Sequence, residues 1–183
     1  MKFAALRAIV ATLLLLPATM PAAAGPVSLD DYADGARFLI PALAAVGTVA
    51  VGDKDGFMQL TFSAANTVAL TEVLKLAIHA DRPNGKGNDS FPSGHAATAF
   101  AGAAFVHDRY GWQWGIPAEL AAAGVAYAQV HNGDHRWGDV VAGAAIAHLS
   151  TYFYVDPRDS GVRLLPFVDV TKHSFNLVVK LGF

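Results

Sequence analysis

Two basic residues, Lys75 and Arg82, lie seven positions apart near the end of a helix-like run. Two turns of α-helix would return the second side chain almost directly beneath the first, so one helix through both would present two cations on one face. Pro83 would then stop the helix and leave Arg82 facing the following loop. Such a pair could bind an anion, although taken alone it is more typical of a solvated helix edge.

The segment Phe91-Pro92-Ser93-Gly94-His95 directly precedes an alanine-rich run. Proline and serine favour the first turn of a helix, and glycine lets a ligand approach the free backbone N–H groups. Because the N-terminus of a helix carries partial positive charge, the segment predicts an anion-binding helix start. His95 stands at its edge, where it could give a proton to a leaving oxygen. The alternative is a capped helix with an incidental histidine.

A third pair, His135 and Asp139, has i to i+4 spacing and follows the loop 131–134. With Asp134 as helix cap, both side chains would share one face, and the carboxylate would accept a hydrogen bond from one imidazole nitrogen. The other nitrogen would then be a nucleophile, with the carboxylate stabilising the positive charge that the ring acquires. A structural His–Asp pair is the alternative.

The same residues allow a metal site, because His131, His135 and Asp139 repeat every four positions. The turn signal Asn132-Gly133 would interrupt that ladder. We therefore predict no metal ligands and no cofactor.

In order and spacing, Lys75-x6-Arg82-Pro83, Pro92-Ser93-Gly94-His95 and His135-x3-Asp139 resemble the three-part signature of the type 2 phosphatidic acid phosphatase and vanadium haloperoxidase superfamily. The resemblance covers residues 57 to 155. It implies a helical bundle with His95 as general acid, His135 as nucleophile and Asp139 as its orienting partner. It also implies a phosphate site made by Lys75, Arg82, Ser93 and the backbone of Gly94.

One position departs from that signature. The family's third motif usually has an arginine six residues before the nucleophile, and here that position is Gln129. Gln129 can still donate hydrogen bonds to phosphate but brings no charge, and losing a charge-assisted donor can cost roughly 10² to 10³ in rate. Arg136 and His131 are the candidates to compensate.

Five uncharged stretches rich in Ala, Leu and Gly predict helices, and Gly, Pro and charged residues separate them. They span residues 38–52, 57–71, 96–106, 120–130 and 140–155. The predicted fold class is therefore all-α, a bundle of five helices. Apolar residues alternate with others over residues 175–183, which predicts a short C-terminal β-strand, or a hairpin with residues 164–170.

The first 24 residues have the pattern of a secretory signal peptide: basic residues at Lys2 and Arg7, an apolar run over 8–16 and small residues over 22–24. The apolar run is too short to cross a hydrocarbon core of roughly 30 Å. We therefore expect one phosphatase-like domain over residues 25–183, with a signature core at 57–155 and a tail at 156–183. The expected location is the periplasm or cell envelope of a Gram-negative bacterium, after cleavage of the signal peptide.

Composition excludes several classes of protein. The chain has no cysteine, which rules out disulfides, thiolate metal sites and a cysteine nucleophile. Its net charge is −2, with scattered Lys and Arg, which argues against a nucleic-acid binder. No uncharged run reaches the roughly 18 residues expected of a spanning helix, so a soluble bundle that could contact a membrane surface is predicted, with short tilted spans as the alternative.

Together these patterns predict a phosphomonoesterase that hydrolyses a phosphorylated lipid or a small phosphoester through a phosphohistidine. Lipid phosphates, undecaprenyl pyrophosphate, lipid A and small soluble esters all fit the sequence. The main alternative is a catalytically weakened relative that binds phosphate or lipid, motivated by Gln129. A vanadate-dependent haloperoxidase and a structural envelope protein are the others.

Overall fold

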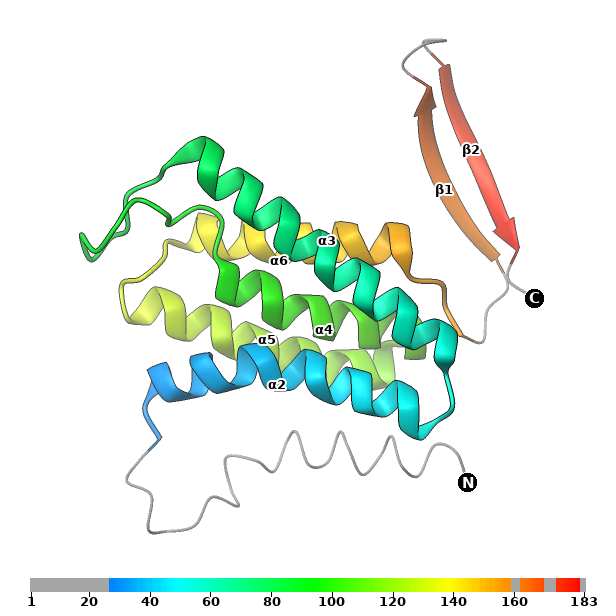
Figure 1. Ribbon diagram of the computed structural model, residues 1–183, viewed down its shortest axis with the longest axis horizontal. Coiled ribbons are helices and arrows are strands. Elements are labelled where there is room, and N and C mark those ends of the chain that lie inside the picture. Colours follow the sequence, from blue (N-terminus) through cyan, green and yellow to red (C-terminus); the bar gives the residue numbers. More distant parts are fainter. Residues whose placement is uncertain (1–26, 159–161, 170–173, 182–183) are drawn as a thin grey trace.

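The computed structural model describes residues 27–158, 162–169 and 174–181. Its helices are α2 (Leu29–Ala50), α3 (Lys54–Ile78), α4 (Gly94–Tyr110), α5 (Trp112–His131) and α6 (Trp137–Tyr154). Each of the five predicted helical stretches lies in or overlaps one of them, so the predicted helical bundle is confirmed (Figure 1). The predicted signal peptide at residues 1–24 lies outside the described residues.

Two strands follow the helices, β1 (Val162–Asp169) and β2 (Ser174–Leu181). They pair antiparallel, with Val162 opposite Leu181 and Asp169 opposite Ser174. The terminal hairpin predicted from the alternating pattern is therefore present in the backbone.

The end of α3 corrects one prediction. The helix stops at Ile78, where His79 takes a left-handed conformation with φ of 48° and its N–H bonds the carbonyl of Lys75. Arg82 therefore lies in the loop 79–93 and not two helical turns below Lys75. Backbone bonds across that loop, from Arg82 N to the Gly87 carbonyl and from Ser90 N to the Ala80 carbonyl, hold the chain in a compact turn.

The start of α6 corrects the prediction that Asp134 caps this helix. Arg136 is the N-terminal cap residue, and the carboxylate of Asp139 accepts a hydrogen bond from Arg136 N at 2.8 Å. Asp134 is occupied elsewhere, because its side chain accepts a hydrogen bond from Asn84 at 2.6 Å. His135 consequently precedes the helix that carries Asp139.

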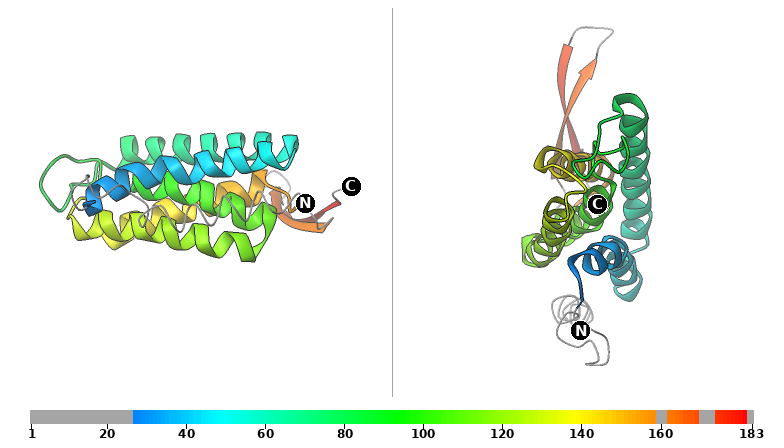
Figure 2. Two further views of the ribbon diagram at one scale, coloured as in Figure 1. Left: turned by 90° about the horizontal axis from the view of Figure 1, so that it is seen from below. Right: turned by 90° about the vertical axis from the view of Figure 1, so that its left-hand side faces the viewer.

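Helix α4 lies at the centre of the bundle and contacts α2, α3, α5 and α6 (Figures 1 and 2). Its small residues let neighbours approach closely. A Cβ atom on Gly102 would lie 2.6 Å from the backbone of Pro41 on α2. A Cβ atom on Gly143 of α6 would lie 2.6 Å from the carbonyl oxygen of Ser93, at the start of α4. These contacts fix α2 and α6 against α4.

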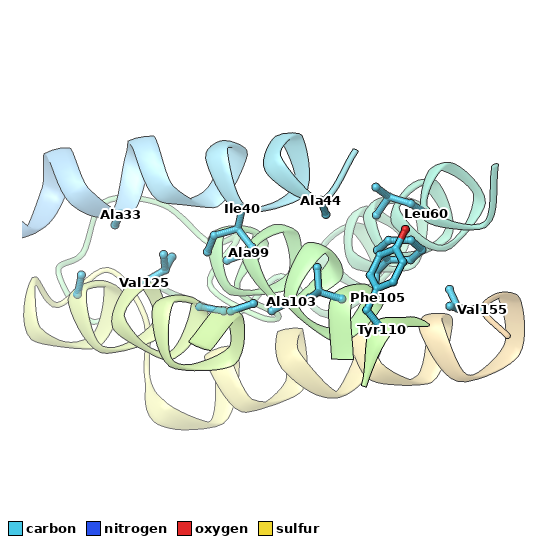
Figure 3. Close-up of a cluster of buried hydrophobic side chains, with 14 of the residues drawn as sticks. Ala33, Ile40, Ala44, Leu60, Ala99, Ala103, Phe105, Tyr110, Val125 and Val155 are labelled. Carbon is cyan, nitrogen blue, oxygen red and sulfur yellow. The ribbon is translucent and has the colours of Figure 1, made fainter. Parts of the chain in front are cut away.

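Apolar side chains fill the interior between these helices (Figure 3). At one end of the cluster, Phe105 is fully buried beside Leu60, Tyr110 and Val155. Truncating a buried phenylalanine of this kind to alanine usually costs about 3–5 kcal/mol of stability. The core thus holds the helices rigidly enough to position groups at their ends.

The opposite end of the bundle collects several chain segments (Figure 1). There α3 and α5 end, α2, α4 and α6 begin, and the loop 79–93 crosses between α3 and α4. All of the predicted site residues lie in these segments.

Candidate active site

The two predicted cations meet at a third residue, Asp89. The guanidinium of Arg82 donates two hydrogen bonds to its carboxylate, from Nε at 2.6 Å and from Nη2 at 2.9 Å. Lys75 donates to the carbonyl of Asp89, and its Nζ lies 4.0 Å from the carboxylate. The hydrogen bond from Arg82 lowers the pKa of Asp89 to about 2, so this carboxylate is charged at neutral pH. Sequence reasoning missed Asp89, although an acidic residue in a loop between two cationic motifs was an available signal.

The N-terminus of α4 lies against the same cations. Ser93 is the cap residue, its Oγ accepts a hydrogen bond from Ala96 N at 3.4 Å, and its N–H donates to the Asp139 carbonyl at 2.9 Å. A Cβ atom on Gly94 would lie 3.8 Å from Cε of Lys75. The end of the Lys75 side chain therefore lies against the start of α4. A cation above a helix N-terminus is a suitable place for an anion.

His135 is buried, with 2% of its surface exposed. Its Nδ1 lies 2.8 Å from the backbone carbonyl of Ser90 and 3.8 Å from Oδ2 of Asp139. A carbonyl only accepts hydrogen bonds, so Nδ1 carries the proton and Nε2 carries the lone pair. The predicted hydrogen bond from His135 to Asp139 is therefore wrong. Asp139 Oδ2 is already occupied by Ser90 Oγ at 2.6 Å and Arg136 N at 2.8 Å.

The surroundings of His135 keep its ring neutral. Burial lowers its pKa to about 4, against the raising effect of the Ser90 carbonyl. The positive charges of Arg82 and Lys75 contribute to this lowering of the pKa, and Asp139 opposes it. At pH 7 the ring is thus an uncharged base beside two cations, which is the state that a nitrogen nucleophile requires.

His95 stands in the first turn of α4 and is held by two residues of α2. Its Nε2 lies 2.8 Å from Oδ1 of Asp34, and Nη1 of Arg37 donates to its Nδ1 at 3.3 Å. Burial lowers the pKa of His95, the hydrogen bond with Asp34 raises it, and Arg37 lowers it again. Sequence reasoning missed both α2 residues, whose signal was an i, i+3 ion pair in a helix with few charges.

Gln129 lies in the last turn of α5 with 4% of its surface exposed. Its backbone carbonyl accepts hydrogen bonds from the N–H groups of Asp134 and His135, both at 3.1 Å. The two residues considered as replacements for its missing charge are used elsewhere. Nη1 of Arg136 donates to the Asp81 carbonyl at 2.7 Å, and the His131 ring stacks on Tyr127.

The alternative of a metal site required one helix through His131, His135 and Asp139, but α5 ends at His131 and α6 begins only at Trp137. His131, His135 and Asp139 therefore do not share a helix. Over the part of the chain that the structure describes, no group of three His, Asp or Glu residues could hold a metal ion.

A family model described as the PAP2 superfamily matches residues 56–158, which include all three motifs. This chain belongs to the PAP2 superfamily. The resemblance read from the motifs is thereby confirmed. The PAP2 match begins after α2, so Asp34 and Arg37 lie outside it.

Two curated proteins are similar to this PAP2 chain. A lipid A 4'-phosphatase of Helicobacter pylori is 30% identical over 141 residues, which cover 71% of this chain and 71% of that protein. A lipid A 1-phosphatase of Porphyromonas gingivalis is 33% identical over 103 residues, which cover 54% of this chain but 22% of the longer relative. No solved structure gives a significant match.

Proposed function

We propose that this chain hydrolyses the phosphomonoester of a phosphorylated lipid through a phosphohistidine at His135, without a metal ion. The PAP2 family and the two lipid A phosphatases make it a lipid phosphatase, a phosphoric monoester hydrolase. The observation that carries the finer proposal is the state of His135. Its ring is buried and neutral, its Nδ1 is held by the Ser90 carbonyl, and it lies within the field of Lys75 and Arg82.

In this proposal the phosphoryl oxygens bind at the start of α4, where Gly94 presents its backbone N–H group and Ser93 its hydroxyl. Lys75 and Arg82 supply positive charge, and Gln129 supplies an uncharged donor. Asp89 holds both cations in the free protein, so the substrate phosphate must compete with its carboxylate for Arg82. The preformed pair keeps the cations converged while no substrate is bound.

The reaction then has two steps. Nε2 of His135 attacks phosphorus, the bond to the lipid oxygen breaks, and protonated His95 gives that oxygen its proton. The phosphorylated ring is positively charged, and Asp139 at 3.8 Å stabilises this charge. In the second step His95 takes a proton from water, the hydroxide oxygen attacks phosphorus, and the bond to Nε2 breaks to release phosphate and regenerate neutral His135.

The outer surface of the bundle supports a lipid as the substrate. Large apolar side chains on the packed pair α3 and α6 are more than half exposed, among them Phe62, Val73, Leu76, Val141 and Phe153. A soluble protein rarely exposes so many apolar groups unless they meet a membrane or a partner. Of the described helices, α2 is long and apolar enough to cross a membrane. We therefore place the reaction at a lipid surface of the bacterial envelope, with lipid A as the first substrate to test.

The test is phosphate release by the purified protein from lipid A, other phosphorylated lipids and small soluble esters. His135→Ala should abolish release, and His131→Ala, a matched control at an exposed ring, should retain it. A ³²P label on the protein should survive an alkaline quench and vanish in acid. Wild-type rates in folded His135→Ala would contradict the nucleophile, and loss with chelator restored by zinc would contradict metal independence. Phosphate binding without turnover would favour the weakened, phosphate-binding relative.

A further inference from the structure

We propose that Arg37 of α2 is the third cation of the phosphate site and supplies the charge that Gln129 lacks. This inference rests on the proposed function. Arg37 is separated from the PAP2 motifs in sequence and lies outside the family match, yet its Nη1 donates to His95 at 3.3 Å. No signature of the family would have pointed to it.

The position of Arg37 follows from how α2 packs on α4. The close contact of Gly102 with Pro41 holds the two helices together, and one to two turns earlier Arg37 reaches the first turn of α4. That turn begins at Gly94, directly after the cap residue Ser93, and it forms the anion-binding helix start. The guanidinium of Arg37, from α2, thus lies at the N-terminus of α4, as does Lys75, from α3.

The guanidinium of Arg37 has N–H groups that no acceptor uses fully. Its Nε is buried and has no hydrogen-bond partner among the described residues. Its Nη2 lies 3.8 Å from Oδ1 of Asp34, too far for a hydrogen bond. Its bond to His95 is long for a charged donor. A buried donor without an acceptor is unfavourable, and a phosphate oxygen would satisfy it. Because the side chain keeps 29% of its surface exposed, it has room to turn toward a ligand.

The hydrogen bond between Arg37 and His95 also sets the protonation state of His95, the general acid. While Arg37 donates to Nδ1 of His95, that nitrogen cannot carry a proton, and Nε2–H is directed to Asp34. When Arg37 turns to the substrate phosphate, Nδ1 becomes free to take a proton from solvent, and Asp34 stabilises the resulting cation. That Nδ1 proton then passes to the leaving oxygen. Substrate binding would therefore convert His95 into the acid that the first step needs.

The experiment compares Arg37→Ala, Arg37→Lys, Gln129→Arg and the double variant Arg37→Ala/Gln129→Arg in the whole protein, using lipid A phosphate release. Arg37→Ala should lower kcat/KM by about 10² to 10³, and lysine should restore part of that loss. Gln129→Arg should raise the activity of Arg37→Ala at least about tenfold, because it returns a guanidinium, and raise that of wild type by a smaller factor. Arg158→Ala, whose guanidinium donates to Val51 at the far end of the bundle, is the matched control.

A pH profile separates this role from a structural one. Burial lowers the pKa of His95, and the charged groups that also act on it are Asp34, Arg37 and Arg82. Removing Arg37 removes a cation that lowers this pKa, so the alkaline limb of kcat/KM should move to higher pH. An unmoved limb, activity within about threefold of wild type, or no rescue in a folded double variant would each overturn the inference.

Failure of the proposed function would look different. If wild type releases no phosphate from any substrate, calorimetric binding of inorganic phosphate tests Arg37 directly. Weaker phosphate binding by Arg37→Ala than by Arg158→Ala would then support Arg37 as the third cation of the site, even in a chain without phosphatase activity. Equal binding would overturn it.

Discussion

Replacing Asp139 by asparagine separates two roles that a carboxylate beside a catalytic histidine can play. In a triad where the acid accepts the hydrogen bond from the ring, an amide lets the ring adopt the wrong tautomer, and the rate falls by about 10⁴. Here the Ser90 carbonyl holds Nδ1–H at 2.8 Å, and Asp139 Oδ2 is 3.8 Å away. We expect the tautomer to survive the substitution, so that only the charge of Asp139 is lost.

That charge matters once the phosphorylated ring becomes a cation. At 3.8 Å, with an effective dielectric constant of about 20, one unit charge stabilises another by about 4 kcal/mol. Ser90 Oγ and Arg136 N already donate to the same oxygen, so part of its charge is offset. Roughly 2–3 kcal/mol of the interaction should remain, which predicts a kcat about 30- to 150-fold lower in Asp139→Asn with KM almost unchanged.

The assay is phosphate release under saturating lipid substrate, with ¹⁵N NMR of the His135 ring to report its tautomer. Asp30→Asn, which removes a carboxylate that bonds Asn132 outside the site, is the matched control. A loss near 10⁴ with a changed tautomer would mean that Asp139 orients the ring directly. A loss below about threefold would mean that no positive charge develops on the ring, and it would refute the phosphohistidine step.

Three other outcomes follow from the same contacts. Asp89→Asn should strengthen inhibition by inorganic phosphate about three- to fivefold, because the half-exposed ion pair of Asp89 with Arg82 contributes about 1 kcal/mol at most. Unchanged inhibition would show that phosphate and the Asp89 carboxylate do not compete for Arg82. Arg109→Ala should lower the free energy of unfolding by about 3–5 kcal/mol in urea, since it leaves buried Asp53 without its charge partner. Stability should fall by about 3 kcal/mol as the pH drops from about 6.5 to about 4, because unfolded His135 binds a proton that the folded ring excludes, and His135→Asn should flatten this slope.

Much of the fold could be predicted from local patterns. Uncharged runs bounded by Gly, Pro and charges marked each of the five helices in the described part of the chain, because helix formation and termination depend on neighbouring residues. The boundaries were less predictable. His79 ends α3 in a left-handed turn, and Arg136 rather than Asp134 caps α6, since Asp134 is held by Asn84 from another segment.

The sequence by itself determined which chemical groups are available: two cations, a Ser-Gly-His helix start and a His–Asp pair, in the order and spacing of the PAP2 superfamily. Only the tertiary structure decided which of them bond to one another. Lys75 and Arg82 meet through Asp89 in a loop, and Ser90 takes the His135 hydrogen bond expected at Asp139. Spacing arguments assume that a helix continues, whereas hydrogen-bond partners in loops are set by packing and follow no period. For the same reason Asp34 and Arg37, some sixty residues before His95 in the chain, became visible only when α2 was placed against α4.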